Sequence, residues 1–485
     1  MKLQSIQLNN YRCYQSNDFN FGEDVTLVIG KNGTGKSTLI SAIRKGMSFI
    51  FSNTGNNKLI KNNSNKVEGF NDWDTTFLEL GEGFQWPTKL SYEMLLDDNL
   101  LKWSFYKDKF GGKLHSKNYK NAQKKFLDNF SKDDSILPLL AFYGDCYPHK
   151  RKESNQVINS FNALLLKSVK LPRDLGYALW NEEGSITTSW FKRTKFILNE
   201  IQQEKDKLDS LESEIIDIAD RMKNFAVADI SATQVKLDIL RQRFNLMKSQ
   251  NYERIVLYET EYKFVSNKVM DFFSNVGELN TDDLILYSIT RRRVGKTDNL
   301  FFNFGKTTSI DEGIFNEESL PMGYLRLIHI VYDIAYRLFI LNGVKETYDG
   351  LVLIDEIELH LHPSLQQTIL ERFTKTFPGL QFIVTTHSPI VLSNLNADTD
   401  RKKIIQLEKI DGEYKDDELP NLFTMDYNSN LVDIMGVNIS NKLLDAYLNA
   451  YNFLKNEDNS LATDYSNKIK DLFDGDIPKF VLEKM

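Results

Sequence analysis

One glycine-rich segment, Gly30-Lys31-Asn32-Gly33-Thr34-Gly35-Lys36-Ser37, constrains the fold of this chain more than any other feature. It follows an apolar run, VTLVIG, and precedes KSTLISAIRKGMSFIF, which has helical periodicity. The pattern GxxxxGK[ST] between a strand and a helix is typical of a phosphate-binding loop, because glycines let backbone N–H groups turn inward around phosphate oxygens. The residues that we expect to bind the nucleotide are Asn32, Gly33, Thr34, Gly35, Lys36, Ser37 and Thr38. Among them, Lys36 would neutralise the β- and γ-phosphates and Ser37 would be a ligand of Mg²⁺.

A second motif, far downstream, consists of four apolar residues that end in two carboxylates, Asp355 and Glu356. Such a run predicts a buried parallel strand whose carboxyl end reaches the nucleotide. By itself it also fits an acidic turn after a core strand, but a phosphate-binding loop in the same chain favours the nucleotide role. We expect Asp355 to hold Mg²⁺ and Glu356 to act as the general base on the attacking water.

A third apolar run, FIVTT, ends at His387. A histidine after a strand is more often structural, but its place soon after the acidic motif favours contact with a γ-phosphate. The sequence therefore predicts Glu356 and His387 as the catalytic residues.

Composition and charge restrict the class of protein. Apolar residues make up 41% of the chain, charged residues 26%, and the net charge is −7, which does not favour nucleic-acid binding through bulk positive charge. The two cysteines, Cys13 and Cys146, form no CxxC pair, and a reducing cytosol is the expected setting. Charged residues interrupt the most apolar stretch, Gly323–Leu341, so an amphipathic helix is expected there and no membrane association.

Between Trp190 and Phe273 the sequence becomes long, charged and helical in period, with AVADIS at the junction of two helices. This pattern fits a coiled-coil-like hairpin or two packed helices inside a helical domain. The expected divisions are a first lobe at 1–149, a helical arm at 150–275, a second lobe at 276–412 and a helical tail at 413–485. The Asn- and Lys-rich segment Asn53–Gly69 is expected to be a mobile loop.

Together, GKNGTGKST, LIDEIELHLHP and IVTTHSP resemble the ATPase head shared by RecF-like, SMC-like and OLD-type proteins. The resemblance implies an α/β ABC-type head, a mixed sheet with a P-loop core, an inserted helical arm, and ATP and Mg²⁺ held between two copies. It also implies a signature loop in which Gly323 approaches the γ-phosphate of the other protomer. Pro321 stands where that family has a serine, and no glutamine of a Q-loop is assigned.

A narrower resemblance rests on YNSNLVDIMGV and SLPMGYLRLIHIVYDIAYR, which are similar to segments of PtuA-type ATPases of Septu and retron systems. It implies an anti-phage ATPase that gates a separate HNH nuclease of the PtuB type, with a reverse transcriptase and its msDNA as further partners. A RecF-like repair ATPase is the alternative. A self-contained nuclease is disfavoured, because no DxD follows an apolar strand after the switch histidine, and no HNH-like pair of histidines lies near a ββα pattern.

Two clusters have competing interpretations. Arg291–Arg293, Lys150–Lys152 and the segment Lys192–Lys195 fit either a nucleic-acid track or solvated faces. Glu358, His360 and His362 suggest a metal site, but the resemblance assigns them to the loop that faces a second copy.

Overall fold

The computed structural model describes residues 1–48, 69–78, 83–96, 99–130, 135–144, 155–178, 180, 187–222, 230–274, 284–306, 309–397, 399–423, 425–436, 442–455, 459–473, 477 and 479–482. They divide into two compact units, Met1–Thr424 and Met425–Met485, and each is described by itself. Residues 53–68 of the expected mobile loop, Cys146 and the basic cluster at 150–152 lie outside the described residues.

A six-stranded sheet forms the centre of the first unit, in the order β16-β15-β3-β14-β13-β9. All neighbouring pairs are parallel except β15 and β16, which are antiparallel. The strands are β3 (Val25–Gly30), β9 (Leu139–Tyr143), β13 (Gly350–Ile354), β14 (Leu380–Thr386), β15 (Lys402–Ile410) and β16 (Glu413–Leu419). Strands β9, β13 and β14 are buried at every position, as expected of parallel strands covered on both faces. The predicted mixed sheet with a P-loop core is confirmed.

A second, antiparallel sheet has the order β2-β1-β6-β7-β8. Its strands are β1 (Lys2–Tyr11), β2 (Tyr14–Asn20), β6 (Thr88–Leu96), β7 (Asn99–Lys107) and β8 (His115–Lys117). β1 pairs antiparallel with β2 and β6, and β7 pairs antiparallel with β6 and β8. In the sequence, a 3-10 turn at Asp72–Asp74 and the two-residue strands β4 (Phe77–Leu78) and β5 (Gly83–Phe84) lie between β2 and β6, and α3 (Tyr119–Phe130) follows β8.

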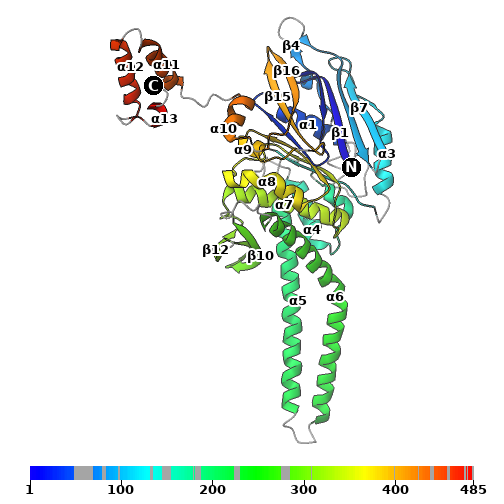
Figure 1. The fold of residues 1–485 in the computed structure, drawn as a ribbon. Coiled ribbons are helices and arrows are strands. Elements are labelled where there is room, and N and C mark those ends of the chain that lie inside the picture. Colours follow the sequence, from blue (N-terminus) through cyan, green and yellow to red (C-terminus); the bar gives the residue numbers. More distant parts are fainter. Residues whose placement is uncertain are drawn as a thin grey trace. The chain divides into compact units, whose positions relative to one another are not determined.

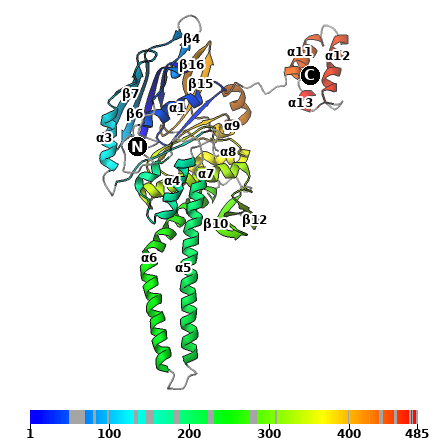
Figure 2. The same ribbon diagram turned by 180° about the vertical axis from the view of Figure 1, so that it is seen from behind.

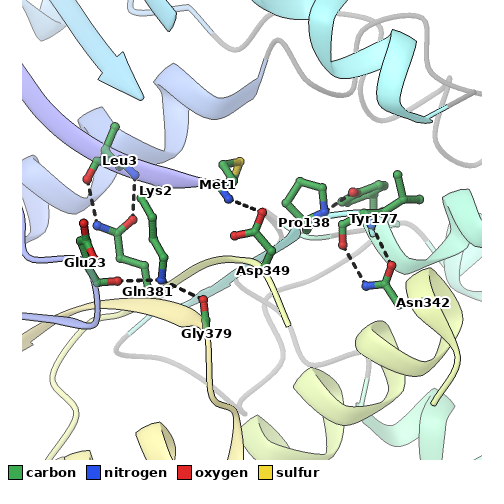
Figure 3. Close-up of polar contacts among 11 residues, drawn as sticks. Met1, Lys2, Leu3, Glu23, Pro138, Tyr177, Asn342, Asp349, Gly379 and Gln381 are labelled. Carbon is green, nitrogen blue, oxygen red and sulfur yellow. Dashed lines mark hydrogen bonds and ion pairs between the residues drawn. The ribbon is translucent and has the colours of Figure 1, made fainter. Parts of the chain in front are cut away.

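Polar contacts join the two sheets (Figure 3). The Gln381 side chain on β14 is fully buried; its amide oxygen accepts from the Leu3 N–H and its amide nitrogen donates to the Leu3 carbonyl, both at 2.8 Å. The Lys2 ammonium donates to the carbonyls of Glu23 and Gly379. The amide of Gln381 therefore satisfies backbone groups that burial would otherwise leave without partners.

Helix α7 (Met322–Asn342) is buried along most of its length. Its charged residues do not face solvent: Asp333 accepts from Trp190, Tyr143 and Arg337. The expected amphipathic helix is therefore wrong in this respect, since these charges are paired inside the core. No helix among the described residues is long and apolar enough to cross a membrane.

The helical arm consists of α5 (Thr187–Met222) and α6 (Ile230–Ser274), which lie side by side in Figures 1 and 2. Leu237 and Leu240 of α6 pack with Ile218 of α5. Near the head, the Arg193 guanidinium is fully buried and makes two 2.9 Å bonds to the Glu261 carboxylate. Of the two arrangements that the sequence left open, the structure shows the helical hairpin. Most of the expected turn, residues 226–229, lies outside the described residues.

The remaining elements of the first unit surround this core. They are α1 (Lys36–Met47), α4 (Asn155–Lys167), a 3-10 helix at Arg173–Tyr177, the antiparallel strands β10 (Ile285–Val294), β11 (Thr297–Lys306) and β12 (Ser309–Asn316), α8 (Pro363–Thr376) and α9 (Pro389–Ser393). A helical tail was expected to start at residue 413, but residues 413–419 form β16, an edge strand that pairs with β15. The expectation of a helix is therefore wrong for this acidic segment.

The second unit contains α10 (Tyr427–Ser429), a π-helical turn at Asn430–Ile434, α11 (Lys442–Leu454), α12 (Asn459–Asp471) and α13 (Lys479–Leu482). Leu448, Ile469 and Val481, one from each of the last three helices, form its core. The helices predicted from the last part of the sequence are therefore present as α11 and α12.

Candidate nucleotide-binding site

Three adjacent parallel strands bring the predicted motifs to one edge of the central sheet. β14 pairs with β3 on one side and with β13 on the other. Because the carboxyl ends of parallel strands lie at the same edge, the loop after β3, the carboxylates after β13 and His387 after β14 meet there. The order of these strands along the chain does not predict that the three motifs meet. β14 comes last of the three in the sequence, yet it lies between β3 and β13 in the sheet.

The loop after β3 is shaped by glycines at its turns. Gly30, Gly33 and Gly35 have φ values of 150°, 81° and 102°, which L side chains rarely adopt. A side chain at Gly35 would also collide with Tyr14, whose hydroxyl donates to the Gly35 carbonyl at 3.0 Å. A Cβ at Gly33 would meet nothing within 4 Å, so space remains above the loop. The loop therefore opens directly onto the N-terminus of α1, where the first-turn N–H groups favour an anion.

Lys36 is the first residue of α1, and its side chain is buried beside the loop. The ammonium donates to the carbonyls of Gly30 at 2.8 Å and Lys31 at 3.1 Å. Burial lowers the pKa of Lys36, and the nearby carboxylates of Asp355, Glu356 and Glu358 oppose that effect. The ammonium is therefore held beside the loop, at the first residue of α1.

The carboxylates after β13 are fixed by a hydroxyl on the neighbouring strand. The Thr385 hydroxyl donates to the Asp355 carboxylate and accepts from the Glu356 N–H at 2.8 Å. Glu356 has a φ of 51°, an uncommon value for a residue other than glycine. The Thr385 hydroxyl thus holds the main chain at Glu356 in this uncommon conformation, and such conformations are often found at functional sites.

Glu358 contributes to the same edge and was not predicted as a nucleotide-site residue. Its carboxylate accepts from the Thr386 hydroxyl at 2.7 Å and from the His387 N–H at 2.6 Å. It therefore anchors the end of β14 and the residue that follows this strand, His387. The signal that was available in the sequence is the pair of threonines, Thr385 and Thr386, which place two hydroxyls at the end of a buried strand.

His387 is half-buried beside these groups. Burial and then the positive charge of Lys36 lower the pKa of His387, while Glu358 and Asp355 oppose them. The lowered pKa keeps the imidazole neutral at pH 7, so it can both donate and accept hydrogen bonds. The structure thus brings Lys36, Asp355 and His387 together, as expected, along with Glu356.

Gly323 lies at the start of α7, apart from the phosphate-binding loop in sequence, and packs against the segment after β13. A Cβ at Gly323 would lie 2.5 Å from the His360 carbonyl oxygen. Close packing therefore requires a glycine here whatever else it contacts. One turn later, the Arg326 guanidinium donates to the Asp355 carbonyl at 2.9 Å, so α7 is bonded to the acidic motif.

The other clusters have mainly structural contacts. His362 caps α8 by accepting from the Ser364 N–H, and Glu358 is bonded to β14, as described above. Within the described residues there is no group of three metal-ligating side chains that could hold a metal ion. Arg193 is buried with Glu261 and Lys195 pairs with Glu317 at 2.8 Å, so the Lys192–Lys195 cluster is not a free basic track. Arg291 bonds Asn199 and Asp298.

A family model described as "AAA ATPase domain" matches residues 1–392. The chain belongs to the AAA ATPase domain family. It is an ATPase, as predicted, and nucleotide binding follows from membership of this family.

Relatives of this AAA ATPase include proteins of retron and Septu systems. The chain is 27% identical to the Retron Vc95 probable ATPase of Vibrio cholerae over 423 residues, which cover 82% of this chain and 72% of the relative. It is 25% identical to the Retron Ec83 probable ATPase of Escherichia coli over 418 residues, which cover 82% and 70%. It is 33% identical to the Septu protein PtuA of Bacillus mycoides over 125 residues, which cover 25% and 16%. The predicted resemblance to retron and PtuA ATPases is confirmed.

Proposed function

We propose that this chain hydrolyses ATP within an anti-phage defence assembly and gates a separate HNH nuclease of the PtuB type. The observation that carries this proposal is the meeting of Lys36, Asp355, Glu356 and His387 at the ends of three adjacent strands. The retron relatives, which align with 82% of the chain, support a defence setting over RecF-like repair.

The geometry suggests how ATP lies. Its β- and γ-phosphates would occupy the loop above Lys36, at the N-terminus of α1. A surface hollow of about 820 Å³ beside the loop would take the nucleoside. Cys13 lines this hollow and also lies against Gly35, which joins the hollow to the phosphate loop. The other side chains in its lining include Arg12, Asn71, Phe77, Lys409 and Tyr414.

The donor set at this edge fits Mg²⁺. The Ser37 hydroxyl and the Asp355 carboxylate would hold the ion, and both are the hard oxygen donors that Mg²⁺ prefers. The bound ion would supply neutralising charge to the phosphates.

The residues of the chain then have distinct roles in hydrolysis. Glu356 would accept a proton from a water molecule that attacks the γ-phosphorus, while the bond from that phosphorus to the bridging oxygen breaks and ADP leaves with phosphate. Lys36 and the N-terminus of α1 would stabilise the negative charge. Neutral His387 would hydrogen-bond a γ-phosphate oxygen and so report whether that phosphate is present.

A second copy would complete the site. The N-terminus of α7, with Met322 and Gly323, would cap the γ-phosphate bound by the other protomer. Met322 is 42% exposed, in keeping with a surface that meets a partner. Arg326 bonds α7 to the Asp355 carbonyl of its own chain. A shift of α7 on capping the partner's nucleotide would therefore also move this chain's own acidic motif.

Mixing two inactive variants tests the shared site. A side chain at Gly323 would disturb His360 in the same chain, so Met322→Asp is the cleaner change: it adds a charge that repels the γ-phosphate across the interface. Lys36→Ala and Met322→Asp should each be inactive, whereas an equal mixture should regain about a quarter of wild-type ATPase activity, because half of the dimers are mixed and each has one intact site. Met322→Leu is the matched control and should remain active. Full activity of Met322→Asp by itself would contradict a shared site.

Nuclease gating gives a separate expected result in cells. Expressed with its HNH partner, the wild-type chain should protect bacteria from phage in a plating assay. Lys36→Ala should reduce protection to the level of an empty vector, because the gate cannot respond to ATP. Undiminished protection by Lys36→Ala would reject the proposal that this chain gates the nuclease. It would not contradict the separate proposal that the chain hydrolyses ATP. Copurification of a reverse transcriptase with its msDNA would distinguish a retron setting from a Septu setting.

A further inference from the structure

Helix α6 carries apolar residues on two opposite sides. On the inner side, Leu237, Leu240 and Tyr258 are buried and belong to the clusters that pack against α5. These contacts account for the hairpin. They leave the outer side of α6 with apolar residues that the hairpin does not cover.

The outer stripe follows a regular heptad. Its positions are separated alternately by four and three residues and are occupied by Val235, Ile239, Gln242, Leu246, Ser249, Glu253, Val256 and Thr260. Val235, Ile239, Leu246 and Val256 are 59%, 58%, 54% and 40% exposed. A spacing of 3.5 residues is that of a helix which packs against another helix as a coiled coil. The outer stripe therefore has the spacing of a second helix-packing seam on α6, with apolar side chains at four of its eight positions.

The stripe continues toward the head. Leu257 and Thr260 line a groove of about 380 Å³ together with Val169, Leu171 and Val344. Val344 is 60% exposed. The exposed apolar surface thus extends beyond the helix, which favours a partner that follows α6 along its length.

The charges beside the stripe indicate which partner fits. The half near the tip is basic on one flank, with exposed Arg243, whereas the half near the head has exposed Glu253 within the stripe. A parallel pair of identical helices would place Glu253 against its own copy, which is unfavourable. An antiparallel pair would place Glu253 against Gln242 and beside Arg243 of the second copy.

The spacing itself is compatible with this arrangement, because the alternation of four and three reads the same in both directions along the stripe. Ile239 would then lie opposite Val256 of the second copy, and Leu246 opposite its Ser249. We propose that the outer stripe of α6 pairs antiparallel with the same stripe of a second copy of this chain. This contact is separate from the proposed head contact and does not rest on it, since it uses no residue of the phosphate site.

Association without nucleotide is the first test. In sedimentation velocity without ATP, the wild type should associate, and Lys36→Ala should associate equally. Ile239→Glu combined with Leu246→Glu should raise the dissociation constant at least about a hundredfold, because two charges would be buried in the seam. Ile216→Glu is the matched control: Ile216 is 55% exposed on α5 of the same arm, and its replacement should change nothing. A monomeric wild type without ATP, or an unchanged double variant, would overturn the proposal.

Cysteine cross-linking tests the orientation and does not depend on the charged variants folding. In a background of Cys13→Ser and Cys146→Ser, Ile239→Cys and Val256→Cys chains would be produced separately and together, then oxidised. Only the co-expressed pair should form a disulfide-linked dimer, because identical positions would lie about 25 Å apart in an antiparallel pair. Cross-linking of either variant with itself would show a parallel pair, and the absence of cross-linking in all three samples would equally reject the contact.

Discussion

Replacing Lys36 with alanine is expected to abolish ATP binding. The Lys36 ammonium is buried beside the loop and held by the carbonyls of Gly30 and Lys31, so it is the cation positioned for the phosphates. Its loss removes the charge-assisted contacts to the β- and γ-phosphates. Isothermal titration calorimetry with ATP and Mg²⁺ should show affinity reduced at least about a hundredfold, which corresponds to two such contacts.

Lys31→Ala is the matched control for this prediction. Lys31 lies in the same loop and its removal changes the net charge equally, but its side chain is exposed. Its affinity for ATP should stay within about tenfold of the wild type, since an exposed charge contributes little. Circular dichroism should show that both variants are folded. Wild-type affinity in a folded Lys36→Ala chain would refute the assignment of the phosphate-binding loop.

Replacing Glu356 with glutamine is expected to leave ATP bound but unhydrolysed. Glutamine keeps the shape of the side chain and removes its basicity, while the Glu356 N–H can still donate to Thr385. Turnover should fall about a hundredfold or more, the usual contribution of a general base. Single-turnover experiments with labelled ATP should show that the nucleotide remains intact on the protein.

Glu358→Gln separates the two carboxylates that lie near Lys36. Both oxygens of Glu358 already accept hydrogen bonds, one from Thr386 and one from the His387 N–H, so it is suited to hold β14 and not to activate water. We expect its turnover to fall less than about tenfold, within the range of a lost positioning contact. The opposite order, with Glu358→Gln severely impaired and Glu356→Gln near wild type, would transfer the role of base to Glu358.

The sequence by itself determined the local parts of the nucleotide site. The segment Gly30–Ser37 predicts a phosphate-binding turn, because its glycines can adopt positive φ and its lysine stands at the start of a helix. The apolar runs before Asp355 and His387 likewise predicted buried strands, because a strand covered on both faces is mostly apolar. These features depend on neighbours in the chain, so a pattern of neighbouring residues is enough to predict them.

The tertiary structure decided which of those parts meet. Strand order is a property of contacts between distant segments, and the sequence does not show that β14 separates β3 from β13. The roles of Thr385 and Glu358 follow from that order, since each bonds a group on the adjacent strand or its end. Arg193 is a further example. Its charge suggests an exposed position when only the sequence is considered, but the structure buries it against Glu261.

The arm gives the last example. Helical periodicity was sufficient to predict two helices, because the 3.5-residue repeat of apolar side chains is local. The sequence of α6 contains two such repeats, and the pattern does not say which one faces α5. Packing of Leu237, Leu240 and Tyr258 uses one of them and leaves Ile239 and Leu246 exposed. Only the tertiary structure decided this, because a helix buries whichever face its partner covers.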